Sequence, residues 1–390
     1  MKVPLLVPHL TEADEQTVIS AIRSGWITQG PQVAAFEDEF AAFTGAKYAC
    51  AVSSATTALH LALLAVGVSP GDEVITVSHS FIATANTVRY CRALPVFVDI
   101  EPETFNINHT LIESAISPNT KAILCVHQIG MPCNMESILA VAKRHNLPVI
   151  EDAACAIGSM VRVNAMFEPV GKPHGDIACF SFHPRKVLTT GDGGMLTTNN
   201  AEYDRQFRLL RQHGMSVSDT VRHNAQEVIF ESYPILGYNY RLTDLQAALG
   251  RGQLKRLPQL VEERRRLAHC YESGLRGLSR LSLPVEPEYA VSNWQSYYVR
   301  LAGDINQKSF MQKMLDAGIS TRRGIMNAHL EPAYGPGTWK CGMCKSKDAT
   351  CDCLRHSCSA QNECVQIPLF PGITEKQIEF VITTLQMLLK

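Results

Sequence analysis

A lysine in a polar, glycine-rich setting is the first residue of this sequence that could do chemistry. Lys186 lies in the segment SFHPRKVLTTGDGGM (residues 181–195), after Ser181 and His183 and before a glycine-rich turn. A lysine amine can act as a nucleophile and form a Schiff base with an aldehyde. In isolation such a lysine is usually a surface charge, so the groups that the rest of the chain places around it decide between the two interpretations.

Two other polar positions follow apolar runs earlier in the chain. Asp152 comes shortly after the apolar run LPVI, and the segment SSAT (residues 53–56) separates an apolar run from a helical pattern. An unpaired buried carboxylate is costly, so Asp152 needs a capping contact, an arginine or a cationic ligand atom. Backbone N–H groups at a helix start can bind phosphate, although plain N-capping by Ser53 or Ser54 explains the same residues.

The surrounding elements decide whether these positions meet. The predicted strands cover residues 48–53, 73–78, 95–100, 121–127, 148–153, 176–182 and 194–199, and the predicted helices cover residues 55–66, 81–91 and 135–145. Near-continuous apolar strands that alternate with helices predict an α/β fold, with a mostly parallel central sheet and helices on both faces. Ligands of such sheets bind beyond the carboxyl ends of the strands, where all three positions are expected.

The C-terminal part of the chain has a different pattern. Residues 242–277 predict a long helix, and shorter strand and helix patterns follow a proline-rich junction near residue 283. We expect a large domain of residues 1–282 and a smaller C-terminal α+β domain of residues 283–390, which carries a cysteine-rich insertion at residues 341–364.

Composition narrows the classes of partner. The net charge is −1 and 46% of the 390 residues are hydrophobic, which gives no sign of a nucleic-acid partner. No run reaches the roughly 18 apolar residues of a membrane span. The opening residues, MKVPLLVPHLTEADEQ, make a poor secretory signal, so we expect a cytoplasmic protein with no membrane partner.

One cofactor accounts for the three polar positions together. Pyridoxal 5′-phosphate (PLP) carries an aldehyde, a phosphate and a ring nitrogen that pairs with an acid. Lys186 suits the aldehyde, residues 53–56 suit the phosphate, and Asp152 suits the ring nitrogen. The order of these features along the chain is that of many PLP enzymes built on a parallel sheet.

The sequence resembles the DegT/DnrJ/EryC1/StrS family of PLP-dependent sugar aminotransferases, members of fold type I, the aspartate-aminotransferase-like fold. The similarity covers nearly the whole chain, and an ordered series of motifs is far more specific than any single motif. The matching stretches are GWITQGPQVAAFEDEFAAFTG (25–45), SSATTALHLAL (53–63), PGDEVITVSHSFIATANTV (70–88), VIEDAACAIGS (149–159), SFHPRKVLTTGDGGM (181–195), LRQHGM (210–215), GYNYRLTDLQAALG (237–250) and IPLFPGITEKQI (367–378).

The resemblance implies two catalytic residues. Lys186 would hold PLP and would move a proton once a substrate amine displaces it. Asp152 would keep the ring nitrogen protonated. Phe81 would stack on the face of the ring, although an ordinary helix core residue is the alternative at this position.

The resemblance also implies the contacts of the phosphate. Ala55 and Thr56 would donate backbone N–H groups to it, and Ser181 would donate its hydroxyl. Asn239 would reach the phosphate from a partner subunit, which implies a homodimer with shared active sites. His183 lies within the lysine motif and is a candidate cofactor contact, and a structural histidine explains it equally well.

Several positions depart from the family pattern. Cys155 follows the EDAA run where the family usually carries glutamine or histidine close to the cofactor, and Gln295 falls where histidine is common. Arg322 and Arg323 lie where paired arginines are unusual. Arginine suits a carboxylate or phosphate of the substrate, and a surface charge explains the pair as well.

The largest departure is the cysteine-rich insertion. Its first thiols, Cys341, Cys344, Cys351 and Cys353, have a spacing that can bind a structural zinc ion. The spacing matches no standard zinc pattern, and reduced thiols or disulfides formed on oxidation are the alternatives.

The expected function is that of a PLP-dependent aminotransferase. An amino acid, expected to be glutamate, would donate an amino group to a keto sugar, expected to be nucleotide-linked. One alternative is a PLP-dependent sugar dehydrase, but those family members replace the lysine with histidine. Another alternative is a non-catalytic regulatory or binding protein of the same fold, which the complete set of Lys186, Asp152 and Ser181 argues against.

Overall fold

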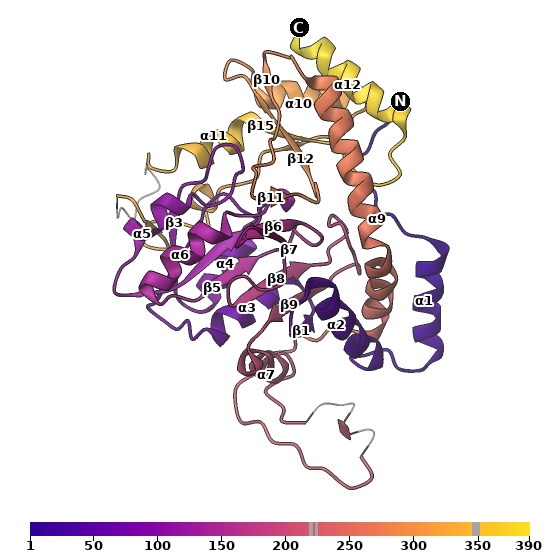
Figure 1. Cartoon of the computed structure of the whole chain (residues 1–390), viewed down its shortest axis with the longest axis vertical. Coiled ribbons are helices and arrows are strands. Elements are labelled where there is room, and N and C mark those ends of the chain that lie inside the picture. Colours follow the sequence, from indigo (N-terminus) through magenta and orange to yellow (C-terminus); the bar gives the residue numbers. More distant parts are fainter. Residues whose placement is uncertain (218–220, 223–224, 345–351) are drawn as a thin grey trace.

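The computed structural model describes residues 1–217, 221–222, 225–344 and 352–390. An eight-stranded sheet forms its centre, and in it only β9 runs antiparallel to its neighbours (Figure 1). The expected α/β fold with a mostly parallel central sheet is confirmed. In spatial order the strands are β1 (Tyr48–Val52), β9 (Gly194–Thr198), β8 (Ile177–Ser181), β5 (Val149–Asp152), β4 (Thr120–Val126), β2 (Glu73–Val77), β3 (Leu94–Val98) and β14 (Lys340–Cys341).

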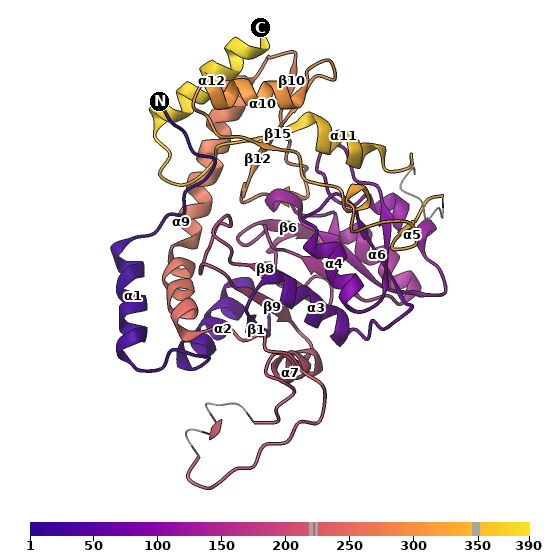
Figure 2. The same ribbon diagram turned by 180° about the vertical axis from the view of Figure 1, so that it is seen from behind.

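Helices cover both faces of this sheet, which explains why its strands read as continuous apolar runs (Figures 1 and 2). Alternate residues of β5 belong to different cores, because Val149 packs on one face and Ile150 on the other. One face is covered by α2 (Pro31–Thr44), α5 (Ile112–Ala115), α6 (Met135–His145) and the first half of α9 (Asp244–Leu275), and the other by α3 (Ala55–Ala65), α4 (Ala83–Tyr90) and α7 (Ala201–Leu210).

A smaller antiparallel sheet lies towards the C-terminus, with a hydrophobic core of its own. Its strands are β10 (Leu281–Ser282), β12 (Tyr297–Leu301), β15 (Cys364–Ile367) and β13 (Arg322–Arg323), and it packs with α10 (Gln307–Asp316), α12 (Glu375–Leu389) and the second half of α9. A three-stranded sheet joins β11 (Ala290–Val291), β6 (Met160–Val163) and β7 (Met166–Pro169).

The two parts share elements on both sides of residue 282. Ser282 pairs within the small sheet, and Val3 near the N-terminus packs in the same core. In contrast, Ala290 pairs with β6, which follows the central strand β5. The division into residues 1–282 and 283–390 therefore stays a prediction about how the chain is organised.

The remaining elements are short or peripheral. They are α1 (Glu12–Arg23), which packs along α9, the helix α11 (Arg355–Glu363), and the 3₁₀ helices η1 (His109–Leu111), η2 (Gln128–Gly130) and η3 (Ala328–Leu330). The cysteine-rich insertion thus adds β14 to the sheet edge and contains α11, where the sequence predicted no element. None of the helices in the described ranges combines the length and apolar character that crossing a membrane requires.

Candidate active site

Asp152 is a buried carboxylate at the carboxyl end of β5. Asp152 is 5% exposed to solvent. Its Oδ2 accepts a hydrogen bond from the Thr84 hydroxyl (2.8 Å), and its Oδ1 accepts one from the Ala154 backbone N–H (3.2 Å). Burial raises the pKa of Asp152. The Ala154 contact is a capping contact, one of the alternatives for this acid. The other, an arginine salt bridge, does not explain it, since within the described ranges no lysine, arginine or histidine forms an ion pair with Asp152.

The adjacent acid, Glu151, has histidine partners for its negative charge. Its Oε2 lies 3.0 Å from Nε2 of His127, and its Oε1 accepts hydrogen bonds from the backbone N–H groups of His174 and Gly175. Burial alone would raise its pKa, but the contacts with His127 and His174 hold it well below its usual range. Of the two neighbouring acids, Asp152 is therefore the one that a cationic ligand would complement.

Lys186 lies in the turn that follows β8. Its backbone N–H donates to the carbonyl of His183 (2.8 Å), and its Nζ donates to Sγ of Cys155 (2.9 Å). The positive charge of Lys186 opposes the effect of burial on the pKa of Asp152. The fold thus brings Lys186, Asp152 and Cys155, which are not adjacent in the sequence, together at the carboxyl ends of the central strands β5 and β8.

The start of α3 leaves two backbone donors available. Ser54 caps the helix through the Thr57 N–H (3.1 Å), so N-capping, one of the two interpretations of SSAT, is present. The first N–H groups of a helix have no partner inside the helix, and in the described parts of the chain those of Ala55 and Thr56 donate no hydrogen bond. A Cβ at Gly194 would lie 2.7 Å from the Ala55 nitrogen, so glycine in the GDGG run allows β9 to pass this close.

Ser181 and His183 lie on either side of the end of β8. Ser181 is opposite Gly194 in the strand pairing, which places it next to the start of α3. His183 is exposed, and its Nδ1 accepts a hydrogen bond from the Arg185 backbone N–H (3.2 Å). Partial burial and the charge of Arg185 lower the pKa of His183. This local contact favours the structural interpretation of His183.

Phe81 is 64% exposed and precedes the first residue of α4. It is therefore not a helix core residue, which was the alternative to ring stacking. The two hydroxyls beside it are turned inward, since the Ser80 and Thr84 oxygens lie 2.8 Å apart and Thr84 reaches Asp152. An open apolar ring next to these groups is suited to contact the face of a planar ligand.

Asn239 lies in the segment between α7 and α9. Its side chain is exposed, and its Oδ1 accepts a hydrogen bond from Nε of Arg241 (3.2 Å). The carbonyl of the next residue, Tyr240, accepts from the Ser53 N–H (2.8 Å), so this segment passes beside the start of α3. Its contribution to a partner subunit stays a prediction.

Two supporting residues were missed by the sequence analysis. Thr84 follows Phe81 by three residues, about one turn of the predicted helix, and this spacing is the sequence signal that could have placed Thr84 beside Phe81. Asn293 is fully buried, and its Nδ2 donates to the carbonyls of Cys155 and Ile157 (2.8 Å each). No local pattern could have identified Asn293, because these partners are more than 130 residues away in the sequence.

Three of the four predicted zinc ligands lie together. The sulfur atoms of Cys341, Cys344 and Cys353 are all within 4.8 Å of one another. Cys351, the fourth, lies outside the described residues.

These observations fit PLP. The chain offers an amine on Lys186, backbone donors for a phosphate, and a buried acid without an ion-pair partner among the described residues. Each feature corresponds to one functional group of this cofactor.

Comparisons with known proteins also indicate a PLP-dependent aminotransferase. The DegT/DnrJ/EryC1/StrS aminotransferase family matches residues 8–386. GDP-perosamine synthase of Caulobacter vibrioides is 38% identical, with 100% of this chain and 98% of that protein covered. The aminotransferase TlmJ of Streptoalloteichus hindustanus superimposes with a TM-score of 0.88 at 30% identity, with 99% of this chain and 98% of that chain covered.

A further structural relative bears on the cofactor. Spr1654 of Streptococcus pneumoniae has been solved in a PLP form and a PMP form. It superimposes with a TM-score of 0.87 at 26% identity, over 99% of this chain and 97% of that chain for the PMP form. The chain described here therefore belongs to the DegT/DnrJ/EryC1/StrS aminotransferase family and is a PLP-dependent sugar aminotransferase of fold type I.

Proposed function

We propose that Lys186 and Asp152 are the catalytic residues and that PLP binds between them. Asp152 would contact the ring nitrogen, and Lys186 the aldehyde carbon. When bound, PLP supplies an electron-accepting ring that stabilises negative charge on the reacting carbon of the substrate. The observation that carries this proposal is a buried carboxylate without an ion-pair partner in the described chain, in one site with a lysine amine.

The phosphate is assigned to the start of α3. The N–H groups of Ala55 and Thr56 point from a helix N-terminus, where backbone donors and the helix dipole favour an anion. The Ser181 hydroxyl would add a third donor, and the exposed ring of Phe81 would cover one face of the cofactor ring. His183 is kept as a candidate contact, although its Nδ1 already accepts a backbone hydrogen bond.

The side chains of this chain move the protons of the reaction. Lys186 Nζ would take a proton from the donor amino acid and return one to the sugar carbon in the second half-reaction. Cys155 Sγ, 2.9 Å from Nζ, would hold this amine in place while it is free. Asp152 stays ionised and keeps the proton on the ring nitrogen.

We assign the substrates from the named relatives. GDP-perosamine synthase is 38% identical to this chain, which supports a nucleotide-linked keto sugar as the amino acceptor. Glutamate is the proposed donor. The dehydrase alternative is disfavoured because the chain has a lysine at position 186, where those enzymes have histidine.

The active site is proposed to be completed by a second copy of the chain. Asn239 would reach the phosphate of the partner subunit from its exposed position. The neighbouring segment also exposes large apolar side chains, namely Val228 (85%), Phe230 (90%) and Leu236 (86%), which suits burial in a dimer.

The two half-reactions test this function directly. Purified protein with bound PLP is mixed with glutamate, and loss of the visible PLP absorption with release of 2-oxoglutarate is expected. The aminated enzyme is then mixed with a panel of nucleotide-linked keto sugars, and mass spectrometry identifies the amino sugar. Lys186→Ala should do neither, whereas Lys255→Ala, an exposed lysine on α9, should do both. A protein that binds PLP but aminates no sugar of the panel would contradict the assigned acceptor.

A further inference from the structure

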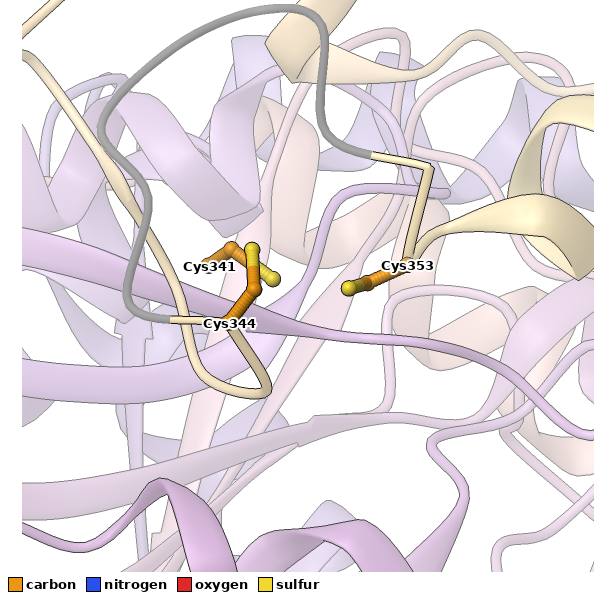
Figure 3. Close-up of side chains that lie close together, drawn as sticks. All are labelled: Cys341, Cys344 and Cys353. Carbon is orange, nitrogen blue, oxygen red and sulfur yellow. The ribbon is translucent and has the colours of Figure 1, made fainter.

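Three thiols from the cysteine-rich insertion converge at one point. Cys341 is the last residue of β14, Cys344 lies in the turn after it, and Cys353 precedes α11. Figure 3 shows the three side chains directed toward a common point, and their sulfur atoms all lie within 4.8 Å of one another. Cys341 is buried, Cys353 is half-buried and Cys344 is exposed, so the cluster opens to solvent on one side.

We propose that Cys341, Cys344 and Cys353 bind one divalent cation of the zinc class. A zinc–sulfur bond of about 2.3 Å with tetrahedral angles puts neighbouring sulfurs about 3.8 Å apart, which the cluster can reach by shifts on the order of 1 Å. Thiolate ligands select zinc and similar soft cations over calcium and magnesium, which require oxygen ligands. Water can complete the fourth position of such a site.

A disulfide is the main rival for these thiols. Cys341 and Cys344 have the C-x-x-C spacing that both disulfides and zinc sites use. A disulfide joins only two sulfurs, however, and does not account for the position of the third, that of Cys353. Within the described ranges no disulfide joins one of these three cysteines to another. Three converging sulfurs are what a metal ion requires.

The ion would tie the insertion to the edge of the central sheet. Cys341 pairs with Phe97 of β3, and its side chain packs with Trp339 and Leu354 in a small apolar cluster. Cys353 directly precedes Leu354. Metal binding contributes free energy of folding, so the ion would add to the stabilisation that this cluster provides.

The start of α11 connects this metal site to the active site. The Asp99 carboxylate accepts hydrogen bonds from the backbone N–H groups of His356 and Ser357 (2.9 Å each). The carbonyl of Ser357 accepts from Nδ2 of Asn327 (2.9 Å), and Oδ1 of Asn327 lies 3.2 Å from Nδ1 of His79. His79 is two residues before Phe81. Loss of the ion is therefore expected to loosen the segment that carries Phe81.

Metal analysis of the full chain tests the proposal. Protein expressed with added zinc and purified under reducing conditions is expected to contain about one zinc ion per chain. Cobalt should replace it and give the near-ultraviolet absorption of cobalt–thiolate bonds. Cys341→Ser, Cys344→Ser and Cys353→Ser should each weaken metal binding at least tenfold. Cys358→Ser is the matched control, because this thiol of α11 lies outside the cluster, near His329, and the variant should keep the metal.

Folding of each variant is monitored by circular dichroism and thermal melting, which do not depend on activity. If the serine variants fail to fold, cobalt titration of zinc-free wild-type protein replaces them, and it should saturate at one ion per chain with thiolate absorption. Folded wild-type protein that binds neither zinc nor cobalt would overturn the proposal, and so would a Cys341–Cys344 disulfide found by peptide mapping. The metal site itself does not rest on the proposed function, so inactive protein with zinc bound would refute the function alone.

The link to the active site rests on the proposed function and has a separate readout. Zinc-free protein is expected to bind PLP a few times more weakly and to have a raised KM for the sugar, with kcat less affected. Unchanged PLP affinity and KM in zinc-free protein would show that the ion does not act on this segment.

Discussion

Asp152 and Glu151 are neighbours on one strand and face opposite sides of the sheet. Glu151 has histidine partners, whereas Asp152 has hydrogen-bond donors and no ion-pair partner in the described chain. The ionised form of Asp152 therefore carries an electrostatic cost that a bound cationic ring would offset. The proposed catalytic acid is therefore expected to destabilise the cofactor-free protein.

Replacement of Asp152 by asparagine should remove this electrostatic destabilisation of the cofactor-free protein. Because burial raises the pKa of Asp152, the folded protein is destabilised at pH values above that pKa, and the penalty vanishes at acidic pH where the carboxyl is protonated. Cofactor-free Asp152→Asn should therefore melt at a higher temperature than wild type at neutral pH, with the difference shrinking as the pH falls through the raised pKa of Asp152 and absent below about 4, the ordinary pKa of this carboxyl. Aminotransferase activity should fall on the order of a hundredfold. Thermal melts across pH check this, and a variant less stable than wild type at neutral pH would contradict it.

Cys155 gives a second prediction at the level of single residues. Its sulfur accepts a hydrogen bond from Lys186, and removing one such bond costs on the order of 1 kcal/mol. Cys155→Ala should therefore lower kcat about five- to tenfold, whereas Cys155→Gln supplies an oxygen acceptor and should recover most of the rate. Steady-state kinetics of both variants check this. An unchanged kcat in Cys155→Ala would show that the contact has no part in the reaction.

The proposed phosphate-binding site at the start of α3 depends on how closely β9 approaches this helix. A Cβ at Gly194 would lie 2.4 Å from the Ser54 carbonyl carbon and 2.7 Å from the Ala55 nitrogen, and both are backbone atoms that have little room to move.

Gly194→Ala should therefore displace the helix start and weaken PLP binding at least tenfold, as measured by equilibrium dialysis. Gly191→Ala is the control from the same turn. Its φ is +84°, so alanine is strained there, but nothing lies within 4 Å of the added Cβ. Gly191→Ala should lower the free energy of unfolding by about 1 kcal/mol and leave PLP affinity unchanged. Equal PLP affinity in both variants would contradict the assigned seat.

The strands and helices of the central sheet could be predicted from the sequence because local patterns specify them. The predicted strand 194–199 corresponds to β9 (Gly194–Thr198), and the helix 55–66 corresponds to α3. β14 could not be predicted, because a two-residue strand exists only through its pairing with β3. α4 begins at Ala83, later than the expected residue 81, which leaves the ring of Phe81 exposed.

The described parts of the segment between α7 and α9 extend away from the body of the chain (Figure 1). Phe230 is 90% exposed there, which is unfavourable for a large apolar ring in water. A partner subunit that covers this segment would remove the exposure and place Asn239 at a shared site.

Phe230→Asp should therefore shift the protein from dimer to monomer and lower activity at least tenfold, because the second subunit would no longer contribute Asn239. Light scattering coupled to gel filtration measures the mass. Met166→Asp is the control, since Met166 is also an exposed apolar residue, at 66%, but lies on β7. A fully active wild-type monomer would contradict the shared site.

The covalent position of the cofactor shows whether Lys186 is the residue that holds PLP. The purified enzyme is reduced with borohydride, which fixes PLP to the amine that holds it, and the peptides are mapped by mass spectrometry. We predict the added mass on the peptide that contains Lys186 and no label in folded Lys186→Ala. A label on a different lysine, or an active enzyme that carries no label, would contradict it.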